Sequence, residues 1–220
     1  LEPMYKMKYF LDNVWYSQGN SLPSIGNTVE EKAEIKQFVK DMFVKKENGT
    51  IAFPPSANNN DGQTVGYACE VMKRFKPTLT VVYLSNVDGC HSNFTSYLQS
   101  LHSADHAVGH LWDYIQNNIP QMAGNTSIIV APEHGRNLEP NNILDANAFY
   151  GYDHSDDNSR RIFNLMAGPG IDANLTIGNE TNGVGDIVNI TPTIAEILGF
   201  KQDVINSGFV YNNNSFFDLI

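Results

Sequence analysis

The sequence is poor in cysteine, in basic clusters and in long apolar runs, and each absence excludes a class of protein. Two cysteines among 220 residues do not make a disulfide framework. The 14 Lys and Arg residues are outnumbered by 24 Asp and Glu and form no basic run, so we expect no nucleic-acid binding through phosphate attraction. No apolar run has the length that a membrane-spanning helix needs, so we expect no membrane span.

The two cysteines have different surroundings in the sequence. Cys69 falls on the apolar face of a predicted helix, and we interpret it as a small buried residue. Cys90 lies in a loop that also carries candidate metal ligands. Lone thiols are usually structural, so a ligand role for Cys90 stays an alternative to a structural one.

Helical and strand patterns alternate along the chain. Amphipathic spacing predicts helices over 27–50, 62–76, 92–120 and 186–200, and apolar β-branched runs predict strands over 78–86, 126–132 and 161–171. The first helix has a capping-box pattern, Thr28 with Glu31. This order predicts one α/β domain over residues 1–220, with a mostly parallel sheet sandwiched between helices.

Carboxylate and imidazole side chains follow the predicted strands. Asp88 and His91 come after the first strand, Glu133 and His134 after the second, and His154 lies in the polar stretch before the third. Ligands gather beyond the carboxyl ends of strands in such sheets, and mixed oxygen and nitrogen donors suit a divalent metal, zinc first. Loop hydrogen bonds and a solvated turn explain the same residues equally well, so both interpretations stay open.

Three further histidines share the helix predicted over 92–120. His102, His106 and His110 recur at four-residue spacing, which could form a metal-binding ladder. Asp105 is the only acidic partner that the helix pattern offers them. We therefore interpret them as partly exposed helix histidines.

Five motifs in register resemble a known family. They are KPTLTVVYLSNVDGCH, ADHAVGHLWDYI, TSIIVAPEHGRN, IFNLMAGPGI and DIVNITPTIAEILGF. In this order they resemble the carboxy-terminal half of the alkaline phosphatase superfamily, in the branch of phosphodiesterases and nucleotide pyrophosphatases. The resemblance covers roughly residues 62–200 and implies an alkaline-phosphatase-like α/β fold.

The resemblance also implies a two-metal hydrolase of small phosphate esters. By position, Asp88, His91 and His154 resemble the ligands of one metal, and Glu133 and His134 resemble ligands of the second. The metals are expected to be zinc, with manganese or magnesium as alternatives. In such enzymes a Thr or Ser nucleophile forms a covalent phospho-enzyme that water then hydrolyses.

The sequence departs from the family pattern in three places. Glu133 stands where the family usually has Asp, and the spacing from Asp88 to His91 is one residue shorter than usual. The nucleophile and another ligand of the second metal lie upstream in the family, and residues 1–61 contain no strand followed by Asp-Gly and a placed hydroxyl. We therefore expect this chain to be the carboxy-terminal part of a larger catalytic domain, with little turnover by itself.

Three alternatives use the same scaffold. A sulfatase carries a similar strand end but a single calcium ion, whereas His154 and the pair of Asp88 and His91 favour two metals. A phosphoglycerate-mutase-like isomerase is a second alternative, and a non-catalytic domain that retains the fold is the third. The oligomeric state stays open. The frequent export of superfamily members is the one suggestion of an extracytoplasmic location, periplasmic or secreted.

Overall fold

The computed structural model divides the chain into two compact units, residues 1–52 and 53–220. The structure describes residues 28–55, 60–142, 144, 146–179 and 181–219. The helices and strands are α2 (Val29–Glu47), α3 (Asn60–Phe75), η1 (Asn86–His91), α4 (Phe94–Asn118), β1 (Ile128–Val130), η2 (Asp157–Arg160), β2 (Leu165–Ala167), η3 (Ile187–Asn189), α5 (Ile190–Ile197), α6 (Lys201–Ser207) and η4 (Phe216–Leu219). The prediction of a single domain over 1–220 stays a prediction.

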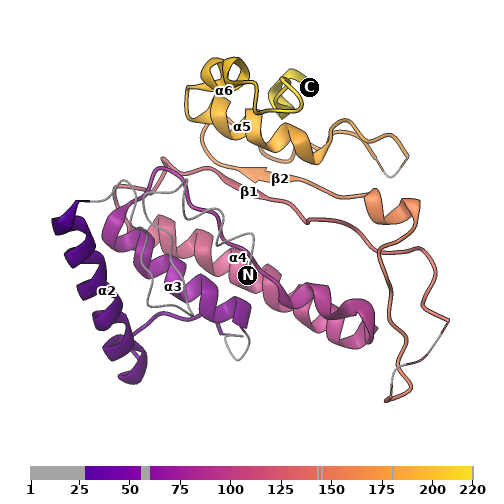
Figure 1. Ribbon diagram of the computed structural model, residues 1–220, viewed down its shortest axis with the longest axis horizontal. Helices are drawn as coiled ribbons and strands as arrows, with labels where there is room; N and C mark the ends of the chain where they lie inside the picture. The colour runs from indigo at the N-terminus through magenta and orange to yellow at the C-terminus, as the bar shows by residue number, and fades with distance from the viewer. Residues whose placement is uncertain (1–27, 56–59, 143, 145, 180, 220) are drawn as a thin grey trace. The chain divides into compact units, whose positions relative to one another are not determined.

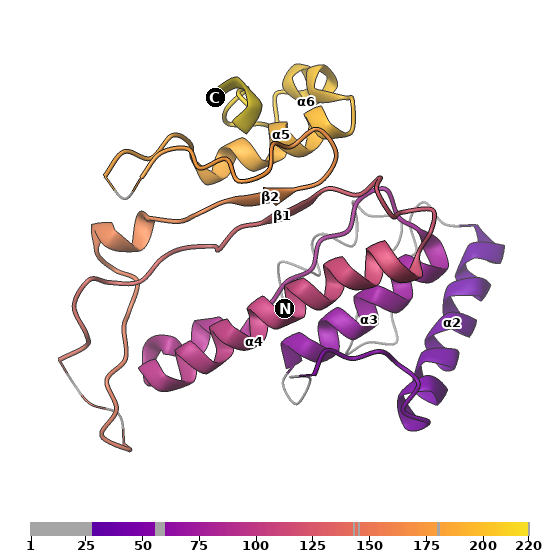
Figure 2. The ribbon, with the colours of Figure 1, turned by 180° about the vertical axis from the view of Figure 1, so that it is seen from behind.

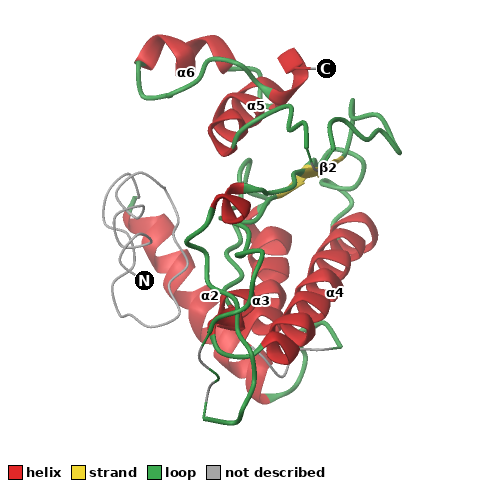
Figure 3. Ribbon diagram, turned by 90° about the vertical axis from the view of Figure 1, so that its right-hand side faces the viewer, coloured by secondary structure: helices red, strands yellow, loops and turns green. Residues whose placement is uncertain are grey.

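The prediction of a mostly parallel sheet is wrong. Regular structure is mostly helical, and the one sheet within the described residues pairs β1 with β2 antiparallel, with Ile129 opposite Met166. Figure 3 shows how little strand the chain forms between its helices and loops. A parallel pair needs a crossover, usually a helix, but the described residues of the connection over 131–164 contain only the short 3₁₀-helix η2. The chain therefore returns alongside β1 in the opposite direction.

The prediction of a strand over 78–86 is also wrong. Residues 79–85 belong to no strand among the described residues, and η1 begins at Asn86. One face of this segment packs on the helical core through Val82 and Leu84. The alternate side chains are exposed, Val81 at 64% and Tyr83 at 58%. The segment therefore has the side-chain alternation of a strand without a strand partner.

Helix α2 belongs to the first unit and begins where the sequence predicts. The Thr28 hydroxyl accepts a hydrogen bond from the Glu31 amide at 3.1 Å, and the Glu31 carboxylate accepts one from the Thr28 amide at 2.9 Å. Gly49, with φ 65°, follows the helix end. Phe38 and Met42 are buried, whereas Phe43, predicted on the same face, is 65% exposed.

The core of the second unit lies between α3 and α4, which run side by side in Figures 1 and 2. Its buried members come from both helices and the turn after α4: Val65, Cys69, Met72, Ala107, Leu111, Tyr114, Ile115 and Ile119. Cys69 is 1% exposed, which confirms that it is a buried structural thiol. Burial, together with the charge of Glu70, raises its pKa to about 12.

The first turns of α4 lie outside this core. Leu98 and Leu101 fall in these turns and are 48% and 41% exposed. Helix α4 has 25 residues and α3 has 16, so α4 is longer by about 14 Å. A helix of the length of α3 cannot cover the whole of α4.

The carboxy-terminal part of the second unit is a group of short helices. Helix α5 contacts η3, α6 and η4. The side chain of Asp186 caps η3, as the polar start of the predicted helix suggests. None of the helices among the described residues has the length and apolar character needed to cross a membrane.

Candidate metal centre

The 3₁₀-helix η1 carries Asp88 and His91, and a buried carboxylate fixes its start. Asp61, in the first turn of α3, is 2% exposed. Its carboxylate accepts hydrogen bonds from the backbone amides of Ser85 at 2.9 Å and Asn86 at 3.1 Å. These two amides have no helical partner because they begin a new helix. Asp61 therefore ties η1 to the core helices.

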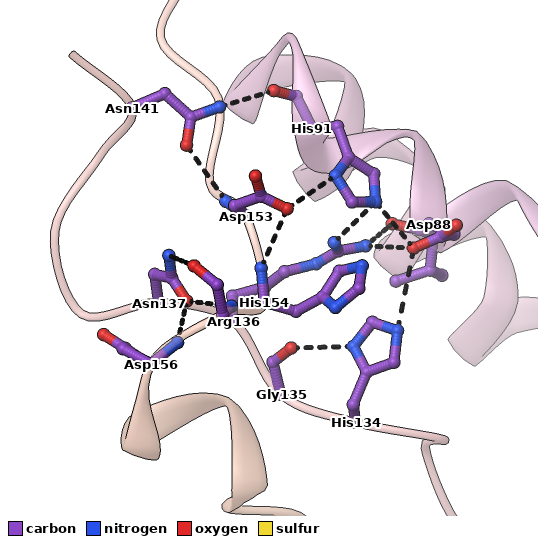
Figure 4. A network of polar contacts seen from close by, with 12 residues as sticks. Asp88, His91, His134, Gly135, Arg136, Asn137, Asn141, Asp153, His154 and Asp156 are labelled. Atoms are coloured by element: carbon purple, nitrogen blue, oxygen red, sulfur yellow. Dashed lines mark hydrogen bonds and ion pairs between the residues drawn. The ribbon is translucent and has the colours of Figure 1, made fainter.

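Asp88, His134 and His154 come together from three separate segments. Each offers one ligand atom, and these atoms all lie within 4.8 Å of one another. Nε2 of His134 lies 3.9 Å from Oδ1 of Asp88, and the rings of His134 and His154 stack at 4.1 Å between centroids. Figure 4 shows these side chains pointing toward a common space.

The His134 ring has the orientation of a metal-binding imidazole. Its Nδ1 lies 2.9 Å from the backbone oxygen of Gly135, which can only accept, so Nδ1 carries the proton. The lone pair of the neutral ring is then on Nε2, the atom that faces Asp88. A ligating histidine usually donates its other N–H to a carbonyl or carboxylate in this way.

A second group of potential ligands consists of His91, Asp153 and His154, again with ligand atoms within 4.8 Å of one another. Nδ1 of His91 lies 3.3 Å from Oδ1 of Asp153, and the rings of His91 and His154 meet edge to face at 4.9 Å. His154 belongs to both groups. Because a neutral imidazole has one free lone pair, His154 serves one metal at a time in this arrangement.

Arg136 lies among these ligands. Its Nη2 donates to Oδ1 of Asp88 at 2.8 Å and to the carbonyl oxygen of Val87 at 3.3 Å, and its Nη1 lies 3.1 Å from Nε2 of His91 (Figure 4). Partial burial acts to raise the pKa of Asp88, but its contacts with Arg136 and His91 outweigh it, so the pKa lies below its ordinary value of 3.8. Asp88 is therefore ionised at neutral pH.

Contacts with the junction of η1 and α4 position the polar excursion that carries His154. The side-chain amide of Asn141 donates to the carbonyl oxygen of His91 at 2.9 Å, and the amide of Phe94 donates to the carbonyl of Tyr150 at 2.8 Å. Gly151 is buried against the same junction, where an added Cβ would lie 2.0 Å from the carbonyl oxygen of His91. The absent side chain thus permits the close approach.

Asn137 shapes the turn that holds His154. Its side-chain oxygen accepts hydrogen bonds from the backbone amides of Ser155 at 2.6 Å and Asp156 at 2.9 Å. Its own backbone amide donates to the carbonyl of Asp153 at 2.7 Å. Asn137 thus connects the segment of His134 to the turn of His154.

Four of the five ligands expected from the sequence lie together: Asp88, His91, His134 and His154. The fifth, Glu133, is exposed and belongs to neither group within the described residues. Cys90 lies in η1, but its side chain falls outside the part of the chain that the structure describes.

The helix histidines lie apart from both groups. His102 and His106 are exposed with ring centroids 4.3 Å apart, and His110 is half-buried, which confirms the interpretation as partly exposed residues. Asp105 and His106 line a cavity of about 420 Å³ beside Trp112, Ile128 and Leu165.

Sequence reasoning missed Asp61 and Asp153 and the position of Arg136. No local pattern points to the role of Asp61, because its partners lie 24 and 25 residues away. Asp153 precedes His154 directly and was interpreted as part of a solvated turn. The charge of Arg136, two residues after His134, was the one signal that pointed to an ionic partner.

Comparison with known proteins agrees with this arrangement. The family model described as "Type I phosphodiesterase / nucleotide pyrophosphatase" matches residues 17–174, more than half of the chain. The chain belongs to this phosphodiesterase family. The matched region contains every member of both ligand groups, and it begins and ends earlier than the range of 62–200 in which the sequence motifs lie.

Two wider searches add no relative. No curated protein and no solved structure matched this phosphodiesterase-family chain.

The ligand groups fit the divalent metals on which such phosphodiesterases typically depend. One carboxylate and two imidazoles offer the mixed oxygen and nitrogen donors that zinc and similar ions accept. The Asp88 carboxylate is ionised, and the free lone pair of His134 is directed at it. These donors come from three chain segments, so a bound metal would hold the segments together.

Proposed function

We propose that the chain forms part of the metal centre of a phosphoric ester hydrolase. The convergence of Asp88, His134 and His154 from three segments, inside the region that matches the phosphodiesterase family, carries the proposal. The catalytic domain that these residues serve is proposed to extend beyond the 220 residues of this chain.

We assign the ligand roles from geometry and from family position together. Asp88, His134 and His154 are the proposed first metal site, and His91 with Asp153 is the proposed start of a second. Glu133 stays a candidate ligand from the family resemblance, because it adjoins His134. The proposed metals are two zinc ions, with manganese or magnesium as alternatives. Because His154 can bind only one ion at a time, occupancy by two ions requires another ligand in one of the two sites.

The chemistry follows from charge. When bound, a divalent metal would neutralise negative charge on phosphoryl oxygens and lower the pKa of a nucleophilic hydroxyl. The two ligand groups supply donors and no hydroxyl nucleophile, so we propose that a Thr or Ser outside them attacks phosphorus. The histidines must be neutral to bind metal, so metal binding is expected to weaken in acid.

Metal analysis and ester hydrolysis test the proposal. The gene product that contains these residues should bind zinc and hydrolyse a nitrophenyl phosphodiester, and Asp88→Asn should lose both properties. Absence of bound metal and of hydrolysis with added zinc or manganese would contradict the proposal. Faster turnover of nitrophenyl sulfate would favour a sulfatase, and metal binding without any ester hydrolysis would favour a non-catalytic domain.

A further inference from the structure

Arg136 and a metal ion compete for the same donor atom. The guanidinium has no lone pair, so its contact with Nε2 of His91 at 3.1 Å is a hydrogen bond only if Nε2 accepts. The ring proton is then on Nδ1, which lies 3.3 Å from the carboxylate of Asp153. The network therefore assigns one tautomer to the neutral ring, and Arg136 engages its single lone pair.

A metal ion can bind either ring nitrogen of His91 only after Arg136 has left Nε2. A metal at Nε2 would take the lone pair that now accepts from Arg136. A metal at Nδ1 would force the ring proton onto Nε2, where an N–H of Arg136 cannot donate to it. The contact between Nε2 and Oδ1 of Asp88 at 3.2 Å would then become a hydrogen bond from His91 to Asp88.

Charge and burial strengthen this competition. The Arg136 side chain is 13% exposed, and its guanidinium is 2.8 Å from Asp88 Oδ1, the oxygen nearest to His134. A cation in this position repels a divalent ion more strongly than an exposed surface charge does, because little water screens it. Arg136 thus provides the positive charge that the acidic ligands need when no metal is bound.

We propose that Arg136 is an internal competitor for the metal, which holds the lone pair of His91 and is displaced when a metal ion binds that histidine. The inference rests on the proposed function, since it concerns the same ligands. It assigns Arg136 a positioning role that controls metal affinity and orders the ligands in the metal-free protein. Filling of the first group, Asp88 with His134 and His154, does not require the bond between Arg136 and His91 to break.

Zinc titration against a chromophoric chelator tests the competition. Arg136→Gln should bind the zinc ion that uses His91 about tenfold more tightly than the wild-type chain, because the loss of a hydrogen bond with a charged donor is of that order. Arg136→Lys should show a smaller gain, since a lysine keeps the charge without the fork of two donors. Arg160→Gln is the matched control: Arg160 is exposed and outside both groups, so zinc affinity should not change.

Nitrogen-15 NMR of the His91 ring gives a readout that does not depend on activity. Without metal, the wild-type ring should be protonated at Nδ1, and Arg136→Gln should weaken that preference. Saturation with zinc should release Arg136, so that its side-chain N–H groups exchange with water as those of an exposed arginine do. Circular dichroism melting shows whether each variant is folded, and the lysine variant tests the inference if the glutamine variant does not fold.

The outcomes separate this inference from the proposed function. Zinc binding by the wild-type chain with equal or weaker binding by both Arg136 variants would overturn the inference and leave the function standing. Protection of the Arg136 N–H groups in the zinc-saturated protein would have the same meaning. An absence of zinc binding in every variant would overturn the proposed function and the inference with it.

Discussion

His154 is the residue on which both ligand groups depend. Asp88 with His134 and His91 with Asp153 each need it to complete a set of three. Its ring lies between those of His134 and His91, at centroid distances of 4.1 Å and 4.9 Å. One substitution at this position therefore removes a ligand from whichever group holds the metal.

We predict that His154→Ala weakens zinc binding by at least about 100-fold, because loss of a direct ligand costs no less than loss of a residue that supports one. Glu133→Gln is the comparison, since Glu133 is exposed and lies in neither group among the described residues. The zinc dissociation constant of Glu133→Gln should stay within about twofold of the wild-type value, as expected for an exposed, screened charge. Chelator competition measures both constants in the same buffer.

The pair of variants distinguishes two ligand sets. If Glu133→Gln lost as much affinity as His154→Ala, the family pattern would describe the ligands better than the geometry does. If His154→Ala bound zinc as the wild-type chain does, neither ligand group would be correct.

Residue types and their order predicted which segments meet at the candidate site. They did not predict the individual contacts within it. Aspartate and histidine after successive apolar segments were enough to predict that Asp88, His91, His134 and His154 would meet. The separation of Glu133 from them was not predictable, because Glu133 lies at a bend whose geometry the residue types do not determine. Asp153 and Arg136 act through contacts with residues far along the chain, which no local pattern contains.

At the scale of elements, the approach of the excursion to η1 determines how close His154 lies to His91. Gly151 makes this approach possible, because a Cβ there would lie 2.0 Å from the carbonyl oxygen and 2.7 Å from the amide nitrogen of the neighbouring backbone at His91 and Ser92. Backbone atoms on both sides leave no flexible side chain to move aside.

We predict that Gly151→Ala lowers the free energy of unfolding by about 1–3 kcal/mol, the usual cost of overpacking. It should also weaken zinc binding, because His154 moves away with the displaced segment. Gly89→Ala, within η1, is the control: an added Cβ there meets nothing within 4 Å. Urea unfolding and zinc titration measure the two effects, and a Gly151→Ala protein that binds zinc normally would show that this approach does not position His154.

Helices were predicted better than strands for a physical reason. The capping box at Thr28 and the apolar spacing of α3 and α4 are local signals, and all three helices form close to the predicted bounds. Strand pairing depends on distant partners, so the apolar β-branched run over 78–86 predicted a strand without showing whether a neighbour would pair with it. Among the described residues, the sheet predicted from such segments consists of β1 and β2 alone.

At the scale of the whole molecule, the acidic composition excludes some partners but says little about stability. Stability against pH depends instead on groups whose pKa differs between folded and unfolded chains. Lys201 of α6 contacts Glu196 of α5 at 2.8 Å and Asp218 of η4 at 2.5 Å, and Ser215 also hydrogen-bonds Glu196. Hydrogen bonds from Lys201 lower the pKa of both carboxyl groups below their ordinary values of 4.5 and 3.8.

We predict that stability falls on both the acid and the alkaline side. Carboxylates with lowered pKa stabilise the folded chain above pH 4.5, and this contribution is lost as pH falls below 4.5 and then 3.8. Burial raises the pKa of Tyr114 from 10.0 to about 12, so the folded chain keeps a proton that the unfolded chain loses. Stability from this group is therefore complete below pH 10.0 and decreases as pH rises toward 12.

Two variants should change the profile, Lys201→Met mainly on the acid side and Tyr114→Phe on the alkaline side. Urea unfolding in the presence of a chelator, followed from pH 3 to 11, measures the profile without bound metal. Lys201→Met should flatten the acid side, because Glu196 and Asp218 lose the shared partner that lowers their pKa. Tyr114→Phe should reduce the alkaline fall, with a remainder from Cys69, whose pKa is also about 12, and from Lys201, whose pKa is raised by its hydrogen bonds to Asp218 and Glu196.

Tyr211→Phe controls for the loss of a phenol, because Tyr211 is 94% exposed. It should retain the full alkaline fall. A Tyr114→Phe profile identical to that of the wild-type chain would show that the buried phenol does not control alkaline stability. An unchanged acid side in Lys201→Met would show that the contacts between α5, α6 and η4 form equally well without the ammonium group, so that their stability comes from apolar packing alone.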